Sequence, residues 1–573
     1  MNEHLKTKWI RPENTVERRS KLQDLRNAKE LNHLADCVLE ILYNRGFDTV
    51  EKIESFLHMD ITDMHNPQLM KDSDKAVSLL SHAIENNLHI VVYGDYDCDG
   101  VSATSIAVLA LRNLGAKVSY FVNNRFKHGY GMNVLGLEDM MKKYPDVDVV
   151  LTVDNGIVAY EGIKKAKELG LTVIVTDHHD PGDHLPEEAD AVVNPKRHDC
   201  EYPFKGLCGA SVIYKVMLQL YWELDKDLDY VQDMIDIVGI ATVGDIMPLI
   251  DENRVFVTES IRQVKRAQRH VFKVLQEKTG VKEITEETYG FKYVPMINAL
   301  GRITGDVDEA IEMFVSQDEE KIPEIVEKVI ETNEYRKKIT EEQEALAIQM
   351  VEEKGIKPVI VIYHPSFHEG IVGLIAGRLK ERYFRPVIVL AEGHGFIKGS
   401  ARSIPNFHIK KAFDETKEYL IGYGGHPMAG GLSLKEEHLE AFEEEICSLA
   451  ESQLTEADFI PRIMVDTVVE PKDVTVDLVE ELDVLKPFGE AFSKPNFGLK
   501  GFKVDKVYYM GENKNHLKLK EKKLEIIMFN RADIYQEMQE PRNIKALGYP
   551  SLNIWNNNVN VQFNIEGINL AGC

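Results

Sequence analysis

The chain has 573 residues, of which 44% are hydrophobic and 28% are charged, and its formal net charge is −26. This length exceeds what one hydrophobic core organises, so the sequence predicts three or four domains. The acidic balance argues against a general nucleic-acid coat protein, because attraction to phosphate dominates that kind of binding. Residues 1–70 are polar and are predicted to form a helical N-terminal lead-in.

Apolar runs alternate with helical stretches over residues 71–315. The predicted strands are residues 88–93, 117–122, 147–153, 171–176 and 190–193. This alternation indicates an α/β domain with a doubly wound parallel sheet. A long connecting helix is predicted for residues 316–355, because Pro323 suits a first turn and Gly355 suits a C-cap.

The remaining chain is predicted to form two further domains. Residues 356–455 again alternate strand and helix and indicate a second α/β domain. Residues 456–573 contain about five short alternating runs separated by turn residues, which favours a C-terminal OB-like β-barrel.

Three carboxylates follow the first predicted strand at alternate positions, in GDYDCDG (94–100). Asp95, Asp97 and Asp99 lie between two glycines, and like charges this close raise one another's pKa. Buried charges of this kind are kept where they coordinate a metal ion. A solvated acidic turn is the alternative.

Further candidate ligands end later elements. Asp154 follows the strand at 147–153, His178 and His179 follow the strand at 171–176, and Asp245 follows a helical stretch. Parallel strands deliver their carboxyl ends to the same edge of a sheet, so these side chains are expected to converge. Hard divalent cations take oxygen ligands, and an added imidazole shifts the preference from Mg²⁺ toward Mn²⁺.

These segments resemble a known family. GDYDCDG, VDNGI (153–157), DHH (177–179) and GDIMPL (244–249) resemble the four motifs of the DHH phosphoesterase superfamily. INALGR (297–302), FHEGIVGLIAGR (367–378), GSARS (399–403) and GYGGHPMAGG (422–431) resemble the second half of its RecJ-type branch, the single-strand-specific 5′→3′ exonucleases. LKPFGEAFSKPNFG (485–498) is similar to the start of that branch's C-terminal domain.

The resemblance implies a centre with two divalent ions, Mn²⁺ or Mg²⁺. Asp97 and Asp154 would bind one ion. The ligands implied for the other are Asp99, Asp154, His178 and Asp245, with Asp154 as the bridge. Asp95 is implied as a ligand or as a brace of the loop, and His179 as a donor to the scissile phosphate or an orienting group. A pyrophosphatase relative has a ligating histidine where this chain has Tyr93, which predicts weaker binding of the first ion.

The resemblance also implies residues that hold the substrate: Arg125, Tyr130, Arg302, His368, Ser400, Arg402 and His426. Arginine offers a planar fork suited to phosphate, and a tyrosine ring stacks on a base. The glycine-rich run 422–431 is expected to approach phosphate with backbone N–H groups, as anion-binding nests do. For the three arginines, a salt bridge across the cleft is the alternative.

The predicted function is a metal-dependent 5′→3′ exonuclease for single-stranded DNA that releases mononucleotides, in DNA recombination and repair. Two alternatives stay open. One is a small-substrate DHH enzyme, either a phosphodiesterase of oligoribonucleotides or cyclic dinucleotides or an inorganic pyrophosphatase, and the other is a catalytically degenerate replication scaffold. The intact acids and histidines of the DHH motifs argue against the scaffold.

The bulk properties predict a cytoplasmic protein. No apolar run reaches the length of about 18 residues that a membrane span needs, and the N-terminus lacks an apolar signal core. Six cysteines without framework spacing are typical of reduced thiols. Single-stranded DNA is the predicted partner, and a helicase and a single-strand-binding protein are candidate partners. The sequence leaves open the repair pathway, cleavage of RNA, the preferred metal and the oligomeric state.

Overall fold

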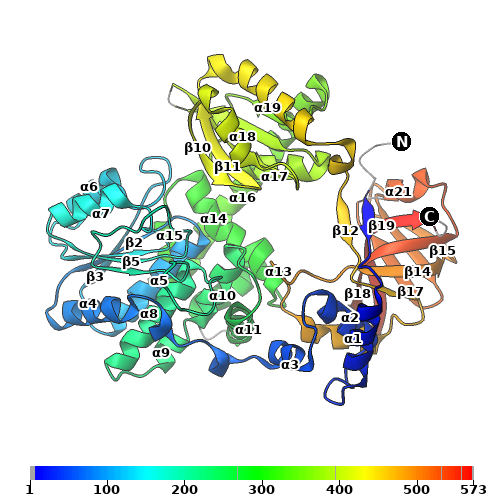
Figure 1. The fold of residues 1–573 in the computed structure, drawn as a ribbon, viewed down its shortest axis with the longest axis horizontal. Coiled ribbons are helices and arrows are strands. Elements are labelled where there is room, and N and C mark those ends of the chain that lie inside the picture. Colours follow the sequence, from blue (N-terminus) through cyan, green and yellow to red (C-terminus); the bar gives the residue numbers. More distant parts are fainter. Residues whose placement is uncertain (1–6, 267–268, 394, 531, 556–557, 571–573) are drawn as a thin grey trace. The chain divides into compact units, whose positions relative to one another are not determined.

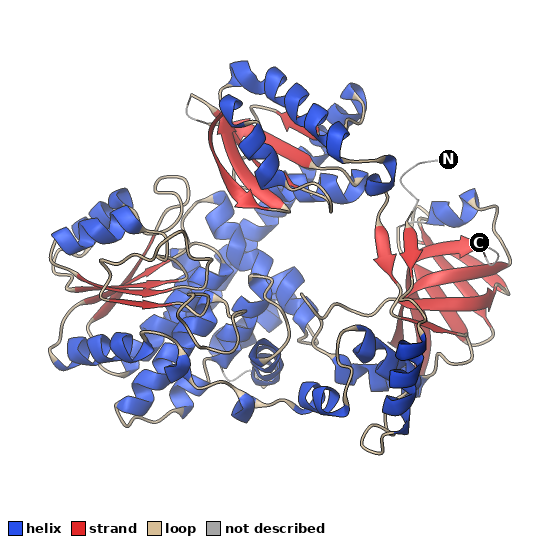
Figure 2. Cartoon of the chain, viewed as in Figure 1, coloured by secondary structure: helices blue, strands red, loops and turns tan. Residues whose placement is uncertain are grey.

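The computed structural model describes residues 7–266, 269–393, 395–530, 532–555 and 558–570. These residues form two compact units: one is Ile61–Ile460, and the other combines residues 7–60 with residues 461–570. The described ribbon is labelled in Figure 1 and coloured by secondary structure in Figure 2.

A five-stranded sheet organises the first lobe of the large unit. Its strands are β2 (Ile90–Gly94), β3 (Val118–Val122), β4 (Val149–Val153), β5 (Thr172–Thr176) and β6 (Ala191–Val193). All neighbouring pairs are parallel, and the order is β3-β2-β4-β5-β6. β2 and β4 are buried along their whole length, which explains their uninterrupted apolar sequences. The predicted doubly wound parallel sheet is confirmed.

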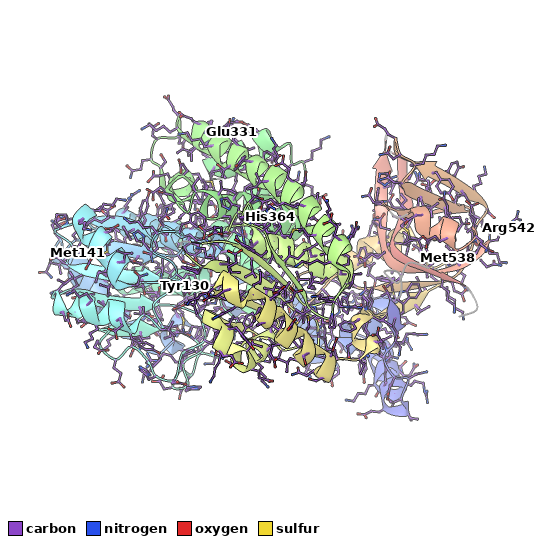
Figure 3. All side chains as sticks on the ribbon, turned by 90° about the horizontal axis from the view of Figure 1, so that it is seen from above. Tyr130, Met141, Glu331, His364, Met538 and Arg542 are labelled. Carbon is purple, nitrogen blue, oxygen red and sulfur yellow. The ribbon has the colours of Figure 1, made fainter. Side chains whose placement is uncertain are left out.

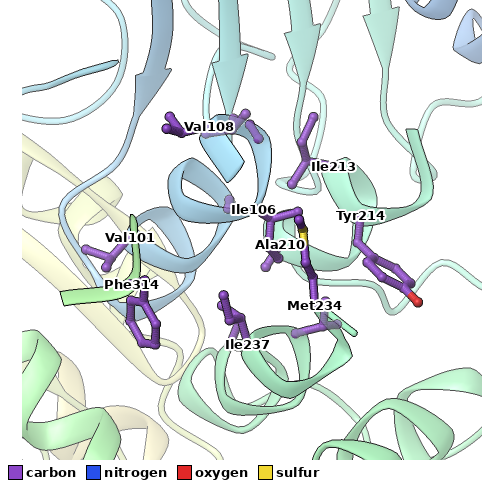
Figure 4. Packing of buried hydrophobic residues seen from close by; sticks show 14 of the residues in the cluster. Val101, Ile106, Val108, Ala210, Ile213, Tyr214, Met234, Ile237 and Phe314 are labelled. Carbon is purple, nitrogen blue, oxygen red and sulfur yellow. The ribbon is translucent and has the colours of Figure 1, made fainter. Parts of the chain in front are cut away.

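Helices cover both faces of this sheet (Figure 2). The helices of this lobe are α4 (Ser73–Glu85), α5 (Cys98–Asn113), α6 (Val134–Lys143), α7 (Tyr160–Glu168), α8 (Gly209–Glu223), α9 (Asp229–Gln232), α10 (Ile235–Gly244), α11 (Glu252–Lys265), α12 (His270–Thr279), α13 (Glu286–Thr288), a π-helix (Tyr289–Tyr293), α14 (Val294–Ile303) and α15 (Asp308–Val315). One core joins α5, α8 and α10 (Figure 4), and the opposite face packs against α6 and α7. The buried α5 thereby fixes the acidic loop that precedes it.

A long helix, α16 (Ile322–Lys354), follows the first lobe. Pro323 lies in its first turn, and Gly355 is its C-cap residue with φ of 83°, as the sequence predicted. α16 packs against α12, α14 and α15 of the first lobe and against α17 (Val372–Tyr383) of the second. It therefore connects the two lobes within one unit.

The second lobe is built on a mixed sheet of order β10-β11-β9-β8-β7. Its remaining elements are β7 (Ile360–Tyr363), β8 (Val387–Glu392), β9 (Ile397–Arg402), α18 (Ile409–Glu415), β10 (Leu420–His426), β11 (Ala429–Leu434) and α19 (Leu439–Gln453). The glycine-rich run 422–431 forms the β10–β11 hairpin, with β10 at the edge of the sheet. The expected approach of its backbone N–H groups to phosphate stays a prediction. β11 pairs with both β9 and β10, so its backbone N–H groups form hydrogen bonds within the sheet.

The smaller unit contains a seven-stranded sheet of order β13-β14-β18-β19-β17-β16-β15. Its elements are β13 (Thr467–Val469), α20 (Val476–Glu481), β14 (Phe497–Lys503), β15 (Lys506–Met510), β16 (His516–Glu521), β17 (Leu524–Met528), α21 (Ala532–Glu537), β18 (Asn543–Trp555) and β19 (Asn558–Leu570). The sequence predicted about five strands here. Short 3-10 turns elsewhere are Ile61–Asp63, Pro67–Leu69, Lys417–Tyr419, Glu436–His438, Glu456–Phe459 and Leu482–Leu485.

The N-terminal segment belongs to this smaller unit and is not the separate lead-in over residues 1–70 that the sequence suggested. It comprises β1 (Lys8–Ile10), α1 (Val16–Asn27), α2 (Asp36–Asn44) and α3 (Val50–His58). β1 pairs in parallel with β12 (Arg462–Met464). Asn44 on α2 donates to the carbonyl of Asp466 at 2.7 Å. Such contacts between distant segments are not visible in local sequence patterns.

Candidate metal centre and substrate cleft

The predicted metal-binding side chains gather at one edge of the first sheet. Asp95 follows β2, Asp154 follows β4, and His178 and His179 follow β5, while Asp245 is the C-cap residue of α10. The strand order reverses between β2 and β4, and open α/β sheets bind ligands at such a point.

Hydrogen bonds hold the acidic loop between β2 and α5. Oδ1 of Asp97 accepts the N–H groups of Asp99 and Gly100, each at 3.0 Å, so Asp97 caps the helix. Oδ1 of Asn298 on α14 accepts the N–H of Cys98, the first residue of α5, at 2.8 Å. α14, which carries INALGR, therefore fixes the start of the acidic helix.

Asp99 is buried and caps a second helix. Its carboxylate accepts the N–H groups of Gly209 at 2.6 Å and Ala210 at 2.8 Å, which α8 leaves unpaired at its N-terminus. A carboxylate has about four acceptor sites, so Asp99 keeps capacity for a cation. A Cβ at Gly209 would lie 2.6 Å from Oδ1 of Asp154, so glycine allows this close approach.

His178 faces three carboxylates. Its Nε2 lies 3.1 Å from Oδ1 of Asp154, 3.4 Å from Oδ2 of Asp245 and 3.6 Å from Oδ2 of Asp99. Burial, together with the neighbouring His179, lowers the pKa of His178 to about 3, so the ring is neutral. Nε2 of His178, Oδ1 of Asp154 and Oδ2 of Asp245 are buried and have no hydrogen-bond partner among the described residues. Buried polar atoms are normally paired, so this set fits a divalent cation held between them.

The acids also oppose one another electrostatically. Burial and the charge of Asp97 raise the pKa of Asp99 to about 6, and burial with the charge of Asp99 raises the pKa of Asp245 to about 8. Burial and neighbouring carboxylates raise the pKa values of Asp95 and Asp154 as well. A divalent cation would neutralise this charge.

Three groups of potential ligand atoms have members within 4.8 Å of one another. They are Asp95 with Asp97 and Asp154; Asp99 with His178 and Asp245; and Asp154 with His178 and His179. Asp154 belongs to two groups, as a bridging ligand would. Asp154 also has a φ of 59°, a left-handed backbone that is strained for a residue with a side chain.

His179 is oriented by Asp177, a residue for which the sequence predicted no role. Oδ1 of Asp177 accepts from Nδ1 of His179 at 2.7 Å, and its Oδ2 accepts the N–H of Ile157 at 2.9 Å. Burial alone would lower the pKa of His179, but the hydrogen bond and charge of Asp177 outweigh it and raise the pKa to about 9. The ring is therefore protonated at neutral pH.

Tyr130 contacts the same histidine. Its hydroxyl lies 3.2 Å from the ring nitrogens of His179, and the two rings meet edge to face at a centroid distance of 5.7 Å. Tyr130, labelled in Figure 3, lies on the loop after β3 and is 47% exposed. The predicted base-stacking ring thus also touches a predicted catalytic group.

A cavity of about 880 Å³ adjoins these loops and the second lobe. Predicted site residues in its lining are Arg125, Tyr130, Arg302, Ser400 and Arg402, and unpredicted ones include Tyr96, Phe126, Phe396 and Tyr423. The β10–β11 hairpin adds Gly422, Gly424, Gly430 and Gly431. The lining of this cavity therefore combines arginine side chains with glycine backbone that no side chain covers.

The arginines of the cavity are held without carboxylate partners. The guanidinium of Arg125 lies 5.3 Å from the ring centre of Tyr96, and Nη1 of Arg402 donates to Oγ of Ser400 at 2.8 Å. Burial and the charge of Arg125 lower the pKa of Arg302 to about 10. In the described part of the chain, Arg125, Arg302 and Arg402 form no ion pair, so the alternative of a salt bridge across the cleft is not found.

The N-terminal end of α17 faces the same cavity through Gly370, Val372 and Gly373. A helix N-terminus attracts anions through its unpaired N–H groups and its dipole. A Cβ at Gly370 would lie 1.8 Å from the carbonyl oxygen of Arg302, so the second lobe packs directly on α14. This part of the cavity is built to receive an anionic group.

Two predicted residues lie outside the lining of this cavity. Nδ1 of His368 accepts the N–H of Gly370 at 3.1 Å, and its ring packs against Phe126 at 6.0 Å, so His368 braces the loop before α17. His426 ends β10 and pairs with Ala429 in the hairpin. Tyr93 is buried and donates to Asn123 at 2.5 Å, which places its hydroxyl on the loop that follows β3.

The fold and this site define the class: a metal-dependent phosphoesterase of the DHH type. Residues 89–242 match the DHH family, N-terminal domain; residues 357–452 match the DHHA1 domain; and residues 465–567 match the RecJ OB domain. The acids at the strand ends and the second lobe fall within the first two matches, while α14 and Asp245 lie between them.

Two named relatives identify the family within this class. The chain is 36% identical over 551 residues to the single-stranded-DNA-specific exonuclease RecJ of Bacillus subtilis, covering 95% of this chain and 69% of that protein. It is 32% identical over 484 residues to the protein of the same name from Haemophilus influenzae, covering 81% of this chain and 83% of that one. The chain belongs to the RecJ family.

Solved structures agree. The crystal structure of RecJ in complex with Mn²⁺ from Thermus thermophilus is similar with a TM-score of 0.84 and 25% identity, covering 99% of this chain and 80% of that one. A crystal structure of exonuclease RecJ bound to manganese is similar with a TM-score of 0.59 and 28% identity, covering 68% of this chain and 96% of that one. The family match also confirms the predicted OB domain.

Proposed function

We propose that the protein is a divalent-metal-dependent exonuclease specific for single-stranded DNA, which degrades the strand from 5′ to 3′ and releases mononucleotides. The observation that carries this proposal is the junction of the acid–histidine edge and the arginine-lined cavity within one unit. The family relatives named for this activity support it.

Mn²⁺ or Mg²⁺ ions fit the buried, unpartnered oxygen and nitrogen atoms of the centre. Two ions held there would make water more nucleophilic and neutralise charge that develops on the phosphoryl group. Asp97 and Asp154 would hold one ion. The proposed ligands of the other are Asp99, Asp154, His178 and Asp245. Asp95 is either a further ligand of the first ion or a brace of the loop; its Oδ1 is buried and has no hydrogen-bond partner among the described residues.

The chain's own groups position the phosphate. His179, protonated and oriented through Nδ1 by Asp177, donates a hydrogen bond to a phosphate oxygen. Arg302, Arg402 and the N-terminal end of α17 hold the phosphates that follow along the strand. His368 and His426 act by supporting these segments, because neither lines the cavity.

The proposed 5′→3′ direction of degradation depends on where the 5′ end of the strand binds. Arg125 binds the 5′-terminal phosphate, and Tyr130 stacks on the first base. Both lie on the loop after β3, beside the metal ligands. The cleft between the two lobes is expected to admit a single strand and to exclude a duplex.

The experiment is digestion of a 5′-labelled and a 3′-labelled single strand, and of the matching blunt duplex, with Mn²⁺ and with Mg²⁺. Labelled mononucleotide appears first from the 5′ end of the single strand, and the duplex resists. Release from the 3′ end, or equal digestion of the duplex, would contradict the proposal. Activity confined to dinucleotides or pyrophosphate would favour the small-substrate alternative.

The proposal also covers the interaction partners of the protein and its location in the cell. A cleft for one strand depends on single-stranded DNA being supplied, so a helicase and a single-strand-binding protein are proposed partners in DNA recombination and repair. Among the described helices, none combines the length and apolar character needed to cross a membrane. The five described cysteines are free thiols, as expected for the proposed cytoplasmic location. Stimulation of duplex degradation by an added helicase tests the partner proposal.

A further inference from the structure

The smaller unit carries a second basic cavity, separate from the metal centre. Its volume is about 570 Å³, and four arginines line it: Arg11, Arg18, Arg19 and Arg26. Arg11 follows β1, and the other three lie on α1. We call this cavity the arginine groove. Such a concentration of guanidinium groups stands out in a chain with 68 basic and 94 acidic residues.

The acids at the groove already have partners. Glu40 accepts from Arg18 at 2.7 Å, and Asp466 lies 3.4 Å from the guanidinium of Arg45. These pairs are largely buried, with side-chain exposures of 11–19%. They form the floor of the groove and do not neutralise the residues at its rim.

The rim is open and positive. Arg11, Arg19 and Arg26 are exposed, and Arg19 and Arg26 are two turns apart on one face of α1. Arg19 donates to the carbonyl of Asn14 at 2.9 Å, and Arg26 meets Asp36 at 3.1 Å, with the Asp36 side chain 73% exposed. Of these three arginines, only Arg26 forms an ion pair among the described residues, and its carboxylate partner is mostly in solvent.

The groove is held rigidly on the seven-stranded sheet. β1 pairs with β12, and Trp9 packs against Gly567 on β19. Oγ1 of Thr467 donates to Oε2 of Glu40 at 2.5 Å, which ties α2 to β13. The spacing of the arginines is thus set by the fold and not by a mobile tail.

We propose that the arginine groove of the smaller unit binds the phosphodiester backbone of single-stranded DNA. The inference rests on the proposed function, because it assigns a second contact to the same substrate. Arginine forks match phosphate oxygens in pairs, and a basic groove on an acidic protein concentrates the contact at one place. The groove reads no base, since the described residues that line it include guanidinium groups and no aromatic ring.

The test uses the full-length protein in EDTA, so that binding is measured without hydrolysis. Fluorescence anisotropy follows labelled oligothymidylates of about 8 and about 40 nucleotides, the shorter being within the span of one OB-fold site. The variant is Arg19→Glu combined with Arg26→Glu. Its control is Lys29→Glu, which reverses an exposed charge just beyond α1 and outside the groove.

The double variant is expected to bind the long strand about tenfold more weakly, with a shallower salt dependence, while its affinity for the short strand stays within about twofold. The control keeps wild-type affinity for both strands. If Arg19→Glu with Arg26→Glu disturbs thermal unfolding, Arg19→Gln with Arg26→Gln repeats the test and is expected to lose about half as much on a logarithmic scale.

Unchanged affinity for the long strand would overturn the inference, as would an equal loss on both strands. Displacement of the long strand by polyglutamate as efficiently as by unlabelled oligothymidylate would overturn it in favour of an acidic peptide. These outcomes are independent of the proposed function, which is tested separately by digestion of the end-labelled single strands and the duplex with the wild-type protein.

Discussion

The two halves of the catalytic cleft each gather charges of one sign, but on side chains of different length and with different supports. The metal edge contains buried carboxylates on short side chains, and helix N-termini fix Asp97 and Asp99. The cavity beside it contains arginines on long side chains, and Arg125 rests on the face of Tyr96. At the metal edge the carboxylates outnumber the one protonated ring, His179, and the three arginines of the cavity have no ion-pair partner among the described residues, so each half is completed by a ligand of opposite sign.

The difference lies in what each half controls. Short, capped carboxylates define positions to fractions of an ångström, as metal coordination requires. Long guanidinium side chains tolerate movement of a phosphate and mainly supply binding. Changes at the metal edge should therefore reduce kcat, and changes in the cavity should mainly raise KM.

Asp154→Ala should break the metal edge most completely. We expect kcat to fall by at least about 10³-fold at saturating Mn²⁺, because a shared ligand supports both ions. Asp95→Ala should lose much less. Thermal unfolding without metal should be unchanged or shifted upward, because a buried carboxylate surrounded by acids is removed. Near-normal kcat, or an unfolded variant, would refute the bridging role.

Lys215→Met tests whether a paired buried charge behaves differently from the unpaired acids. Nζ of Lys215 lies 2.7 Å from Oε2 of Glu252, and both side chains are at most 1% exposed. Removing one partner of a buried pair should cost about 3–5 kcal/mol in the free energy of unfolding, measured by urea denaturation. Adding Glu252→Gln should recover part of the loss. A variant as stable as wild type would show that the pair is not coupled.

Arg125→Ala probes the arginine half. We expect kcat/KM on 5′-phosphorylated single strands to fall roughly tenfold to a hundredfold, since a charge-assisted contact is worth about 1.5–3 kcal/mol. Strands with a 5′-hydroxyl should lose far less, and they provide the matched control. Equal losses on both substrates would assign Arg125 to the structure of the loop, where it already contacts Tyr96.

Tyr130→Phe should give the smallest effect and separates the two contacts of this ring. The variant keeps a ring for stacking but loses the hydroxyl that lies 3.2 Å from the His179 nitrogens. We expect kcat to fall about threefold to tenfold with KM unchanged, because one hydrogen bond is worth about 1 kcal/mol. Tyr130→Ala should also raise KM. A rise in KM for Tyr130→Phe would point to a direct contact of the hydroxyl with DNA.

The first sheet, the acids at the ends of its strands and the connecting helix could be predicted from the sequence. The buried strands β2 and β4 are continuous apolar runs, and the acids at their carboxyl ends must meet because the sheet is parallel. Gly355 and Pro323 marked the connecting helix because their backbone preferences are local. Strand direction therefore accounts for the convergence of the residues at the strand ends, whereas Asp245, the C-cap residue of α10, is brought to them by helix packing.

Other features were decided by contacts between distant segments. The glycines of the run 422–431 argued against a helix, but only the pairing of β11 with β10 and β9 made this run a hairpin. Asn298 and Asp177 act through single hydrogen bonds to backbone or ring atoms, which leave no periodic signal in sequence. The N-terminal helices joined the C-terminal sheet through the pairing of β1 with β12. The sequence by itself determined which chemistry gathers at the sheet edge, because the alternation of strands and helices along the chain makes the strands parallel. The tertiary structure decided which helix braces each acid and where the arginines lie, because those positions depend on packing between distant segments.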